Sequence, residues 1–370
     1  MFPTRRIITS GGDVYRDQYS LDFDGTNDYL FVLNKVIDVT ANFTISMWIK
    51  FHDADPSTHN SIIDLGTDDD NHFALIIAGN LLKWSLQVGG VLQRKRSSDV
   101  SFSNNIWYHI VFAVASSSAT CYVNGVEIDV TVTQEDSPDD MDGADDTCYI
   151  GTVGGAATRF FDGQISEIVV WNTSFSLSQA KTIYNGGKPF DARNVALSNL
   201  SYYWRMGDGE GDVKGLAGLI NDVTPSSTLG AELITNGGFA DGSNWSIESG
   251  SPTWTIGGGV ASANEGDAMH IVMDEGILTQ DKIYRVQYEI SNYSSGTLNT
   301  SSDNGTLTGP NRTANGVYVE YVQITANDLL YFISAELDGD LDNVSIKEVT
   351  GSPALMNNFA GYSFTGDVPR

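Results

Sequence analysis

Three acidic residues spaced two positions apart, Glu336, Asp338 and Asp340, form the nearest approach in this sequence to a set of catalytic carboxylates. Residues two apart on a strand face the same side, so such a set could present a nucleophile and a proton donor to a sugar. This set contains Gly339, which weakens a strand. The motifs GxSxG, HExxH and the P-loop are absent. We therefore predict that the chain is not an enzyme.

Clustered carboxylates could instead hold a metal ion. Asp139 and Asp142 lie in the segment EDSPDDMDGADD at 135–146, and a shorter acidic cluster occupies 68–70. Such side chains repel one another unless a hard cation or water separates them, and Ca²⁺ prefers oxygen ligands. Neither segment has the full spacing of a calcium loop that ends in a bidentate Glu. A solvated loop and a structural calcium site with Asp139 and Asp142 as ligands both stay open.

Aromatic rings in the second half of the chain could stack on sugar rings if they lie on the surface. Trp245 follows a turn rich in Gly, Asp and Ser, which makes it the first candidate for a surface ring, and Tyr293 is the second. The alternative, that these rings pack in a core, stays open for both. The histidines are scattered without the spacing of metal ligands, and His109 lies in an aromatic segment typical of a packed strand.

The charge of the chain limits its partners. Asp and Glu total 47 and Lys and Arg total 20, which gives a formal charge of −27. Phosphate backbones repel such a polyanion, so we exclude nucleic acid as a partner. We expect no membrane insertion, because no apolar run reaches the roughly 18 residues that a span needs. The first residues, which contain Arg5 and Arg6 and no apolar stretch behind them, do not fit a secretory signal peptide.

Two cysteines, Cys121 and Cys148, occur in the similar contexts TCYVNG and TCYIG. On neighbouring strands they could form one disulfide. Two buried free thiols are favoured if the chain folds in a reducing cytoplasm.

Short segments with strand patterns indicate how these side chains are positioned. FTISMWIKF at 43–51 alternates large apolar residues with others, as a strand with one buried face does. Asn124-Gly125 predicts a tight hairpin. The one predicted helix lies within SFSLSQAKTIYNGG at 174–187, with Ser176 as its N-cap and two glycines beyond its end.

These patterns predict an all-β fold of two consecutive antiparallel β-sandwiches (jelly rolls) with one short helix. A chain of 370 residues is too long for one ordinary core. Changes in composition give an N-terminal arm at 1–17, a first sandwich at 18–206, a Gly-, Asp- and Ser-rich linker at 207–231, a second sandwich at 232–350 and a tail at 351–370.

The first sandwich resembles the laminin-G-like, concanavalin-A-type jelly roll over about residues 18–206. Four stretches carry the resemblance: LDFDGTNDYLFV at 21–32, FTISMWIKF at 43–51, NNIWYHIVFAVASSSATCYVNGVEI at 104–128, and FFDGQISEIVVWNTSFSLSQAKTIYN at 160–185. The same fold occurs in glucanases that carry Glu-x-Asp-x-Glu on one strand. The triplet at 336–340 lies outside this region, so an endo-glycosidase is the disfavoured alternative.

The second sandwich resembles the carbohydrate-binding modules attached to polysaccharide hydrolases. LITNGGFADGSNWSI at 233–247 and LDGDLDNVSIKEV at 337–349 carry this resemblance. In that family the first and last strands often hold a structural calcium, and the resemblance places its ligands at Asn236 and Asp342. Ala240 departs from the pattern, because an acidic residue is usual there.

The pairing of these two modules resembles the structural proteins of tailed-bacteriophage virions. It implies a non-catalytic head decoration, fibre or tail component, located on the virion, with other virion proteins and cell-surface glycans as partners. The alternative is a bacterial surface adhesin or polysaccharide-binding protein with an extracellular location. The tail carries apolar residues that we expect outside both cores, where burial between subunits would favour a homo-oligomer, with a trimer preferred. These residues are Leu355, Met356, Phe359, Tyr362 and Phe364.

Overall fold

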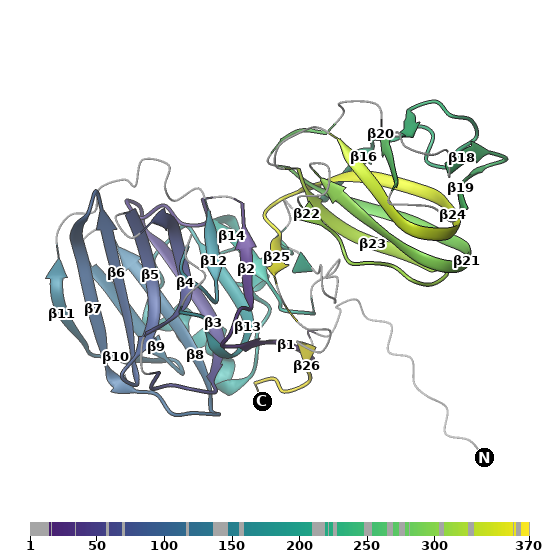
Figure 1. Cartoon of the computed structure of the whole chain (residues 1–370). Helices are drawn as coiled ribbons and strands as arrows, with labels where there is room; N and C mark the ends of the chain where they lie inside the picture. Colours follow the sequence, from purple (N-terminus) through teal and green to yellow (C-terminus); the bar gives the residue numbers. More distant parts are fainter. Residues whose placement is uncertain are drawn as a thin grey trace, which may run out of the picture.

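The fold is nearly all β, in antiparallel sheets, with one short α-helix among the described residues, which confirms the predicted fold class. The computed structural model describes residues 15, 17–33, 35–56, 59–68, 71–115, 118–135, 147–154, 159–208, 219–220, 222–224, 228–247, 254–264, 269–273, 278–280, 282–302, 307–324, 329–357, 359 and 364–369. Figure 1 shows the first sandwich mainly in purple to teal, with two short yellow strands from the end of the chain, and the second sandwich in green and yellow. Within the described part of the chain, no helix is long and apolar enough to cross a membrane.

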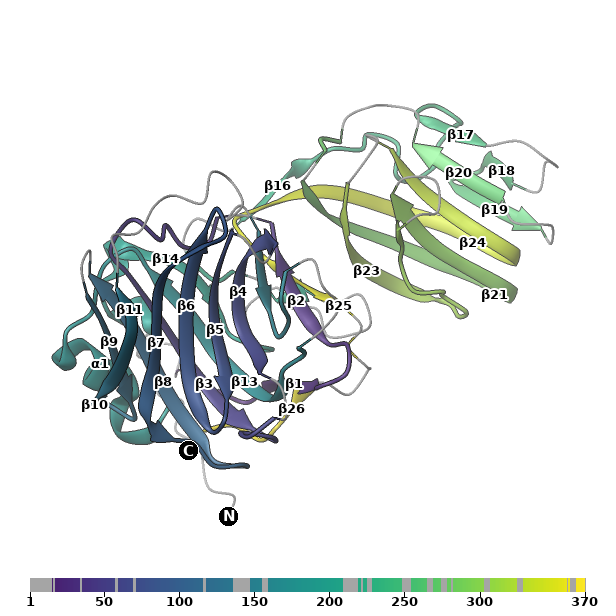
Figure 2. The ribbon, with the colours of Figure 1, turned by 60° about the vertical axis from the view of Figure 1, so that its left-hand side comes forward.

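The first sandwich packs two sheets face to face (Figures 1 and 2). Sheet I runs in the order β10-β9-β8-β3-β13-β1-β26, with β14 also paired to β13. Its strands are β1 (Ser20–Asp24), β3 (Phe43–Phe51), β8 (Trp107–Ala115), β9 (Ser118–Val123), β10 (Val126–Ile128), β13 (Asp162–Trp171), β14 (Leu200–Trp204) and β26 (Phe364–Thr365).

Sheet II runs in the order β11-β7-β6-β5-β4-β12-β2-β25-β15. Its strands are β2 (Tyr29–Val32), β4 (Asn60–Asp68), β5 (Asn71–Ala78), β6 (Leu81–Val88), β7 (Val91–Ser101), β11 (Val130–Glu135), β12 (Cys148–Ile150), β15 (Leu219–Ile220) and β25 (Ala354–Asn357). Aromatic and branched side chains from both sheets fill the core between them, where Phe23, Phe51 and Phe112 are fully or almost fully buried.

The helix α1 (Leu177–Tyr184) lies on the outer side of sheet I. Ser176 caps it, and the Ser176 and Gln179 side chains form a capping box, as the sequence indicated. Three short 3-10 turns follow before β14, at η1 (Asn185–Gly187), η2 (Ala192–Asn194) and η3 (Leu197–Asn199). A second apolar cluster, which includes Trp171, Ile183 and Tyr203, joins this segment to the sheet.

Strand β3 is buried along all nine residues, so the expectation of a single buried face is incomplete. Its large apolar residues face the main core. Its second face, which carries Ser46, Trp48 and Lys50, is covered by other parts of the chain: Trp48 contacts Tyr184 of the helix, and the Lys50 ammonium pairs with Asp367 near the C-terminus.

The tail does not lie outside the cores, and that expectation is wrong. Met356 and Phe359 belong to the core of the first sandwich, and Phe364 packs against it. Strand β25 pairs with β2, and β26 pairs with β1. The Trp204 indole N–H also donates to the Ser352 carbonyl (2.8 Å). The described apolar residues of the tail are therefore covered by their own chain, which removes the argument for burying them between subunits. Tyr362 lies outside the described residues.

Within the expected linker, β15 pairs with β25 at the edge of sheet II. The next described strand, β16 (Thr228–Glu232), belongs to the second sandwich. The second sandwich is therefore inserted between two strands of the first, and two chain segments connect the sandwiches (Figure 2).

The second sandwich is built around two long antiparallel strands, β21 (Ile283–Ser302) and β24 (Leu330–Thr350). Register shifts, with left-handed backbone at Asn292 and Glu336, bend this ribbon so that it serves both layers. Its core includes Phe239, Trp254, Tyr288 and Phe332. The other strands are β17 (Trp245–Ile247), β18 (Trp254–Gly257), β19 (Val260–Asn264), β20 (Met269–Met273), β22 (Leu307–Thr308) and β23 (Gly316–Gln323).

Candidate binding site

Three aromatic rings gather on the outer face of sheet II. Tyr29 and Phe31 alternate along β2 with Leu30 and Val32, which are fully buried, so the two rings point away from the core. Tyr149 of β12 lies opposite Phe31. The ring centroids of Phe31 and Tyr149 are 5.1 Å apart, and those of Tyr29 and Tyr149 are 6.2 Å apart. All three rings are partly exposed. We call them the aromatic platform.

Neighbouring backbone fixes the Tyr149 ring. A Cβ at Gly154 would lie 3.2 Å from the Tyr149 ring and 2.1 Å from the Gly66 carbonyl oxygen, so only glycine allows the chain to pass this close. The Gly154 N–H donates to the buried Asp64 carboxylate (3.1 Å), and Asp64 lies opposite Tyr149 in the sheet. The loop after β12 is thereby held against one side of the platform.

The platform hydroxyls are neutral. Burial raises the pKa of Tyr29, and burial together with the neighbouring Tyr29 and Asp64 raises the pKa of Tyr149. Neutral phenols both donate and accept hydrogen bonds, which suits a ligand rich in hydroxyl groups.

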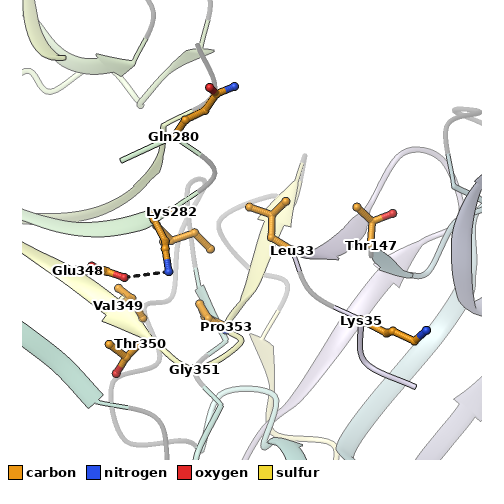
Figure 3. A pocket seen from close by; sticks show the side chains of 11 residues that line it. Leu33, Lys35, Thr147, Gln280, Lys282, Glu348, Val349, Thr350, Gly351 and Pro353 are labelled. Carbon is orange, nitrogen blue, oxygen red and sulfur yellow. Dashed lines mark ion pairs between the residues drawn. The ribbon is translucent and has the colours of Figure 1, made fainter. Parts of the chain in front are cut away.

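The platform continues into a cleft of about 690 Å³ between the two sandwiches (Figure 3). Leu33 follows Phe31 by two residues and Thr147 precedes Tyr149 by two, and both line the cleft from the first sandwich. The second sandwich contributes Gln280 and an ion pair between Lys282 and Glu348 (3.2 Å). The remaining lining residues are Lys35, Ile283, Val349, Thr350, Gly351 and Pro353.

An apolar contact joins the two walls. Ile283 and Val349 of the second sandwich form a small buried cluster with Leu33, Tyr321 and Leu355 packed against it. A cleft with this apolar contact, a polar rim and an adjoining row of rings can bind a ligand that has both apolar and hydroxylated faces.

The structure places Trp245 in a core, so the expectation of a surface ring is wrong. Its side chain is 4% exposed and packs against Phe239 and Phe332, and its indole N–H donates to the Asn236 carbonyl (2.9 Å). Tyr293 is partly exposed, but its hydroxyl donates to the Gly296 carbonyl (3.0 Å) at the bend of β21. Neither residue lines the cleft.

The expected calcium ligands Asn236 and Asp342 lie in adjoining segments, because the Val344 N–H donates to the Gly237 carbonyl (2.8 Å). The Asn236 amide is already used within its loop: its nitrogen donates to the Asp241 and Ser243 carbonyls and its oxygen accepts from the Ala240 N–H. The described residues contain no group of three or more His, Cys, Asp or Glu side chains that could hold a metal. Asp139 and Asp142 lie outside the described residues, and calcium stays a prediction.

The acidic triplet of β24 does not form one catalytic face. Glu336 has a left-handed backbone (φ 52°) at a bend. The Asp338 carboxylate accepts from the Ser294 hydroxyl, and Asp340 accepts from the Asn292 amide (2.7 Å). Each aspartate thus accepts a hydrogen bond from a side chain at the bend of β21.

His109 is a packed sheet residue, as expected. Its ring contacts those of Trp48 and Tyr184, its Nε2 is 3.0 Å from the Ser46 hydroxyl, and burial lowers its pKa to about 3. Cys121 and Cys148 are buried free thiols. They lie in different sheets, on β9 and β12, so the expectation of neighbouring strands is wrong.

Sequence reasoning missed the platform residues Tyr29, Phe31 and Tyr149. The segment DYLFVL at 28–33 has large apolar residues on both faces, so its alternation does not show which face is buried. A signal was present, since Tyr and Phe occupy alternate positions on the same face.

Comparison with known proteins supports the resemblance of the first sandwich. Residues 24–181 match the family described as the concanavalin A-like lectin/glucanases superfamily, under the name Laminin_G_3. A search of curated proteins found no match.

Among solved structures, a Bacteroides ovatus protein described as carbohydrate binding is 22% identical with a TM-score of 0.41, and the alignment covers 57% of this chain and 56% of that one. The CBM40 module of the Ruminococcus gnavus IT-sialidase, bound to α2,3-sialyllactose, is 15% identical (TM-score 0.36; 45% of this chain, 96% of that chain). Domain 4 of the Geobacillus stearothermophilus arabinanase AbnA, in complex with arabinotriose, is 19% identical (TM-score 0.36; 48% and 84%).

Proposed function

We propose that this chain is a non-catalytic glycan-binding protein whose ligand lies on the aromatic platform and enters the cleft. The observation that carries the proposal is the continuity of three partly exposed rings, Tyr29, Phe31 and Tyr149, with cleft residues on the same sheet face. Sugar rings present apolar C–H faces that pack on aromatic rings, and their hydroxyl groups need polar partners. The family match of residues 24–181 to lectins and glucanases supports this ligand class.

The proposal also states that the chain binds its glycan without hydrolysing it. A glycosidase needs two carboxylates placed on either side of the scissile bond. Among the described residues that line the cleft, Glu348 is the one carboxylate, and that group is paired with Lys282.

We place this activity on the exterior of a virion, as a head decoration, fibre or tail component that contacts cell-surface glycans. The support is the pairing of the two modules, which resembles that of tailed-phage structural proteins. A bacterial surface adhesin is the alternative. Peptide mass spectrometry of purified particles tests the placement: peptides of this chain in particles support it, and peptides confined to cell envelopes favour the adhesin.

Loss of the platform tests the binding proposal. We expect Tyr149→Ala to weaken glycan binding by about tenfold or more, which corresponds to roughly 1.4 kcal/mol, and Tyr149→Phe to retain most of it because the ring remains. Tyr318→Ala is the matched control, since this half-buried ring on β23 is not part of the cleft. Calorimetry against a polysaccharide panel gives the affinities, and thermal melts confirm folding. Equal affinity of folded Tyr149→Ala and wild type would refute the proposal.

A further inference from the structure

Two basic side chains face each other on the outer surface of the second sandwich. Arg285 of β21 and Lys347 of β24 are direct partners in the antiparallel register. The following pair, Val286 and Ile346, is fully buried, so Arg285 and Lys347 point outward. Like charges directly opposite one another on adjacent strands destabilise a sheet.

Neither cation of this pair forms an ion pair with a carboxylate among the described residues. The Arg285 guanidinium donates to the Gln287 amide oxygen (2.9 Å), and the Lys347 ammonium has no ion pair in the described part of the chain. Glu232 is the residue opposite Lys347 on the other side, but its carboxylate accepts from the Ser345 hydroxyl and the Ile346 N–H (2.7 Å).

The pair is unusual for this sandwich. Residues 232–350 contain four basic side chains, and the other two are matched with acids: Lys282 with Glu348 and Arg312 with the buried Glu320 (2.9 Å). In a chain of net charge −27, carboxylates are abundant, yet Glu232 beside Lys347 is held by Ser345 and Ile346, and no described acid forms an ion pair with Arg285 or Lys347. An external anion is therefore the natural counter-charge.

The pair also lies beside the cleft. Ile283 and Val349, which line the cleft, are two residues from Arg285 and Lys347 on the same strand faces. Tyr321 lies opposite Arg285 on β23 and packs against the same apolar contact. A polymer that leaves the cleft along this face would therefore meet both cations next to an aromatic ring.

We propose that Arg285 and Lys347 bind the carboxylate or sulfate groups of an acidic polysaccharide. The inference rests on the proposed glycan-binding function and names its ligand class. A guanidinium can donate two parallel hydrogen bonds to a carboxylate or a sulfate, and an ammonium beside it adds a further charge-assisted hydrogen bond. Acidic sugars suit the site better than a phosphodiester polymer, because the net charge of −27 on the chain repels the dense charge of a phosphate backbone.

The test compares acidic and neutral polymers on the same variants. Polygalacturonate supplies carboxylates, dextran sulfate supplies sulfate esters, and dextran is the neutral reference. We expect Arg285→Gln and Lys347→Gln each to weaken binding of an acidic polymer by about tenfold, and the double variant by more, with a weaker salt dependence. The matched control is Lys95→Gln, which removes an exposed cation of β7 on the first sandwich.

The outcomes separate this inference from the proposed function. Unchanged binding of both acidic polymers by the folded double variant would overturn the inference, as would equally tight binding of duplex DNA by wild type. If acidic binding depends on the cation pair but is unchanged in Tyr149→Ala, the pair stands and the platform proposal fails. The polymer with the larger loss identifies whether carboxylate or sulfate is the ligand group.

Discussion

At the scale of single residues, Asn236 shows how one side chain can organise a loop. Its amide makes hydrogen bonds to three backbone groups between Ala240 and Ser243, and its own carbonyl accepts the Trp245 indole N–H. The same residue is the expected ligand of a structural calcium. The two roles predict different responses to a chelator.

We expect Asn236→Ala to lower the free energy of unfolding by about 1–3 kcal/mol, because it leaves backbone groups of the loop without their partners. The loss should be the same with calcium or with EDTA in the buffer, as measured by urea denaturation. Asn311→Ala, which removes an amide-to-amide contact with Asn299 (2.8 Å), is a control for loss of an exposed side-chain hydrogen bond. A loss of stability in Asn236→Ala seen only with calcium would assign the amide to a metal, with Asp342 as the expected second ligand.

The structural role of a residue was predictable where the local backbone determines it, and not where burial by distant residues determines it. The Ser176 cap and the Asn124-Gly125 hairpin follow from the backbone that each sequence favours, and both are present. Trp245 was the first candidate for a surface ring because it follows a polar turn, and a core position stayed open. Its contacts with Phe239 and Phe332 place it in the core, and the local sequence does not show them. Tyr149 was missed because the sequence does not show which face of its short strand is buried.

At the scale of elements, a β-bulge in β13 places the buried Glu167 carboxylate beside Tyr203 and Arg205. Glu167 has a left-handed backbone (φ 57°) where the pairing of β13 with β3 shifts register. Its carboxylate accepts from the Tyr203 hydroxyl and the Arg205 guanidinium. The segment before β1 docks here: Asp17 contacts the Ser166 hydroxyl (3.2 Å), and Asp208 accepts the Gln18 and Tyr19 N–H groups (2.7 and 2.8 Å).

This docking should weaken as the pH rises. Burial, opposed by Arg205, raises the pKa of Glu167 to about 7, and burial with the nearby Glu167 and Asp208 raises the pKa of Asp17. A raised carboxyl pKa means that the docked state holds protons that a released segment gives up above about pH 4. The stabilisation is therefore complete below that pH and is lost as the pH rises through the pKa of Glu167, about 7, and that of Asp17, about 9.

Hydrogen exchange measures this effect. We expect the Gln18 and Tyr19 amides to lose protection between about pH 5 and 8 after correction for intrinsic exchange, and Glu167→Gln to flatten the dependence. The Ile110 amide, in the middle of sheet I, is the internal reference. Protection that increases with pH would contradict the sign derived from Asp17 and Glu167.

Strands with regular alternation were predictable as elements, but the extent of β21 and β24 was not. Each runs through a bend at which Asn292 or Glu336 takes a left-handed backbone, so the register that would identify one long strand is broken in sequence. The short strands β25 and β26 also lacked a pattern, because four and two residues are too few for periodicity.

At the scale of the whole molecule, the path of the chain determines how the two sandwiches are held. The second sandwich was expected to follow the first through a single linker. Instead the chain returns after β24, pairs with β15 and β2, and ends beside β1. Asp367 fixes this end by its contacts with Lys50 and with the Trp107 indole N–H (3.1 Å). Two connections limit how the cleft between the sandwiches can open.

Because of this topology, cleavage of the chain between the sandwiches should not separate them under native conditions. We expect cleavage at a protease site inserted between Ser226 and Ser227, after β15 and before β16, to leave one particle in size-exclusion chromatography, because β25 and β26 hold the C-terminal fragment in the first sandwich. Denaturing electrophoresis should show two fragments.

Met356→Asp with Phe359→Asp should release the C-terminal fragment after cleavage, since each places a charge in the core where the wild-type side chain is at most 6% exposed. The same two substitutions in uncut protein, where both connections remain, control for unfolding of the second sandwich. Separation of the wild-type fragments immediately after cleavage would show that the tail does not hold the sandwiches together.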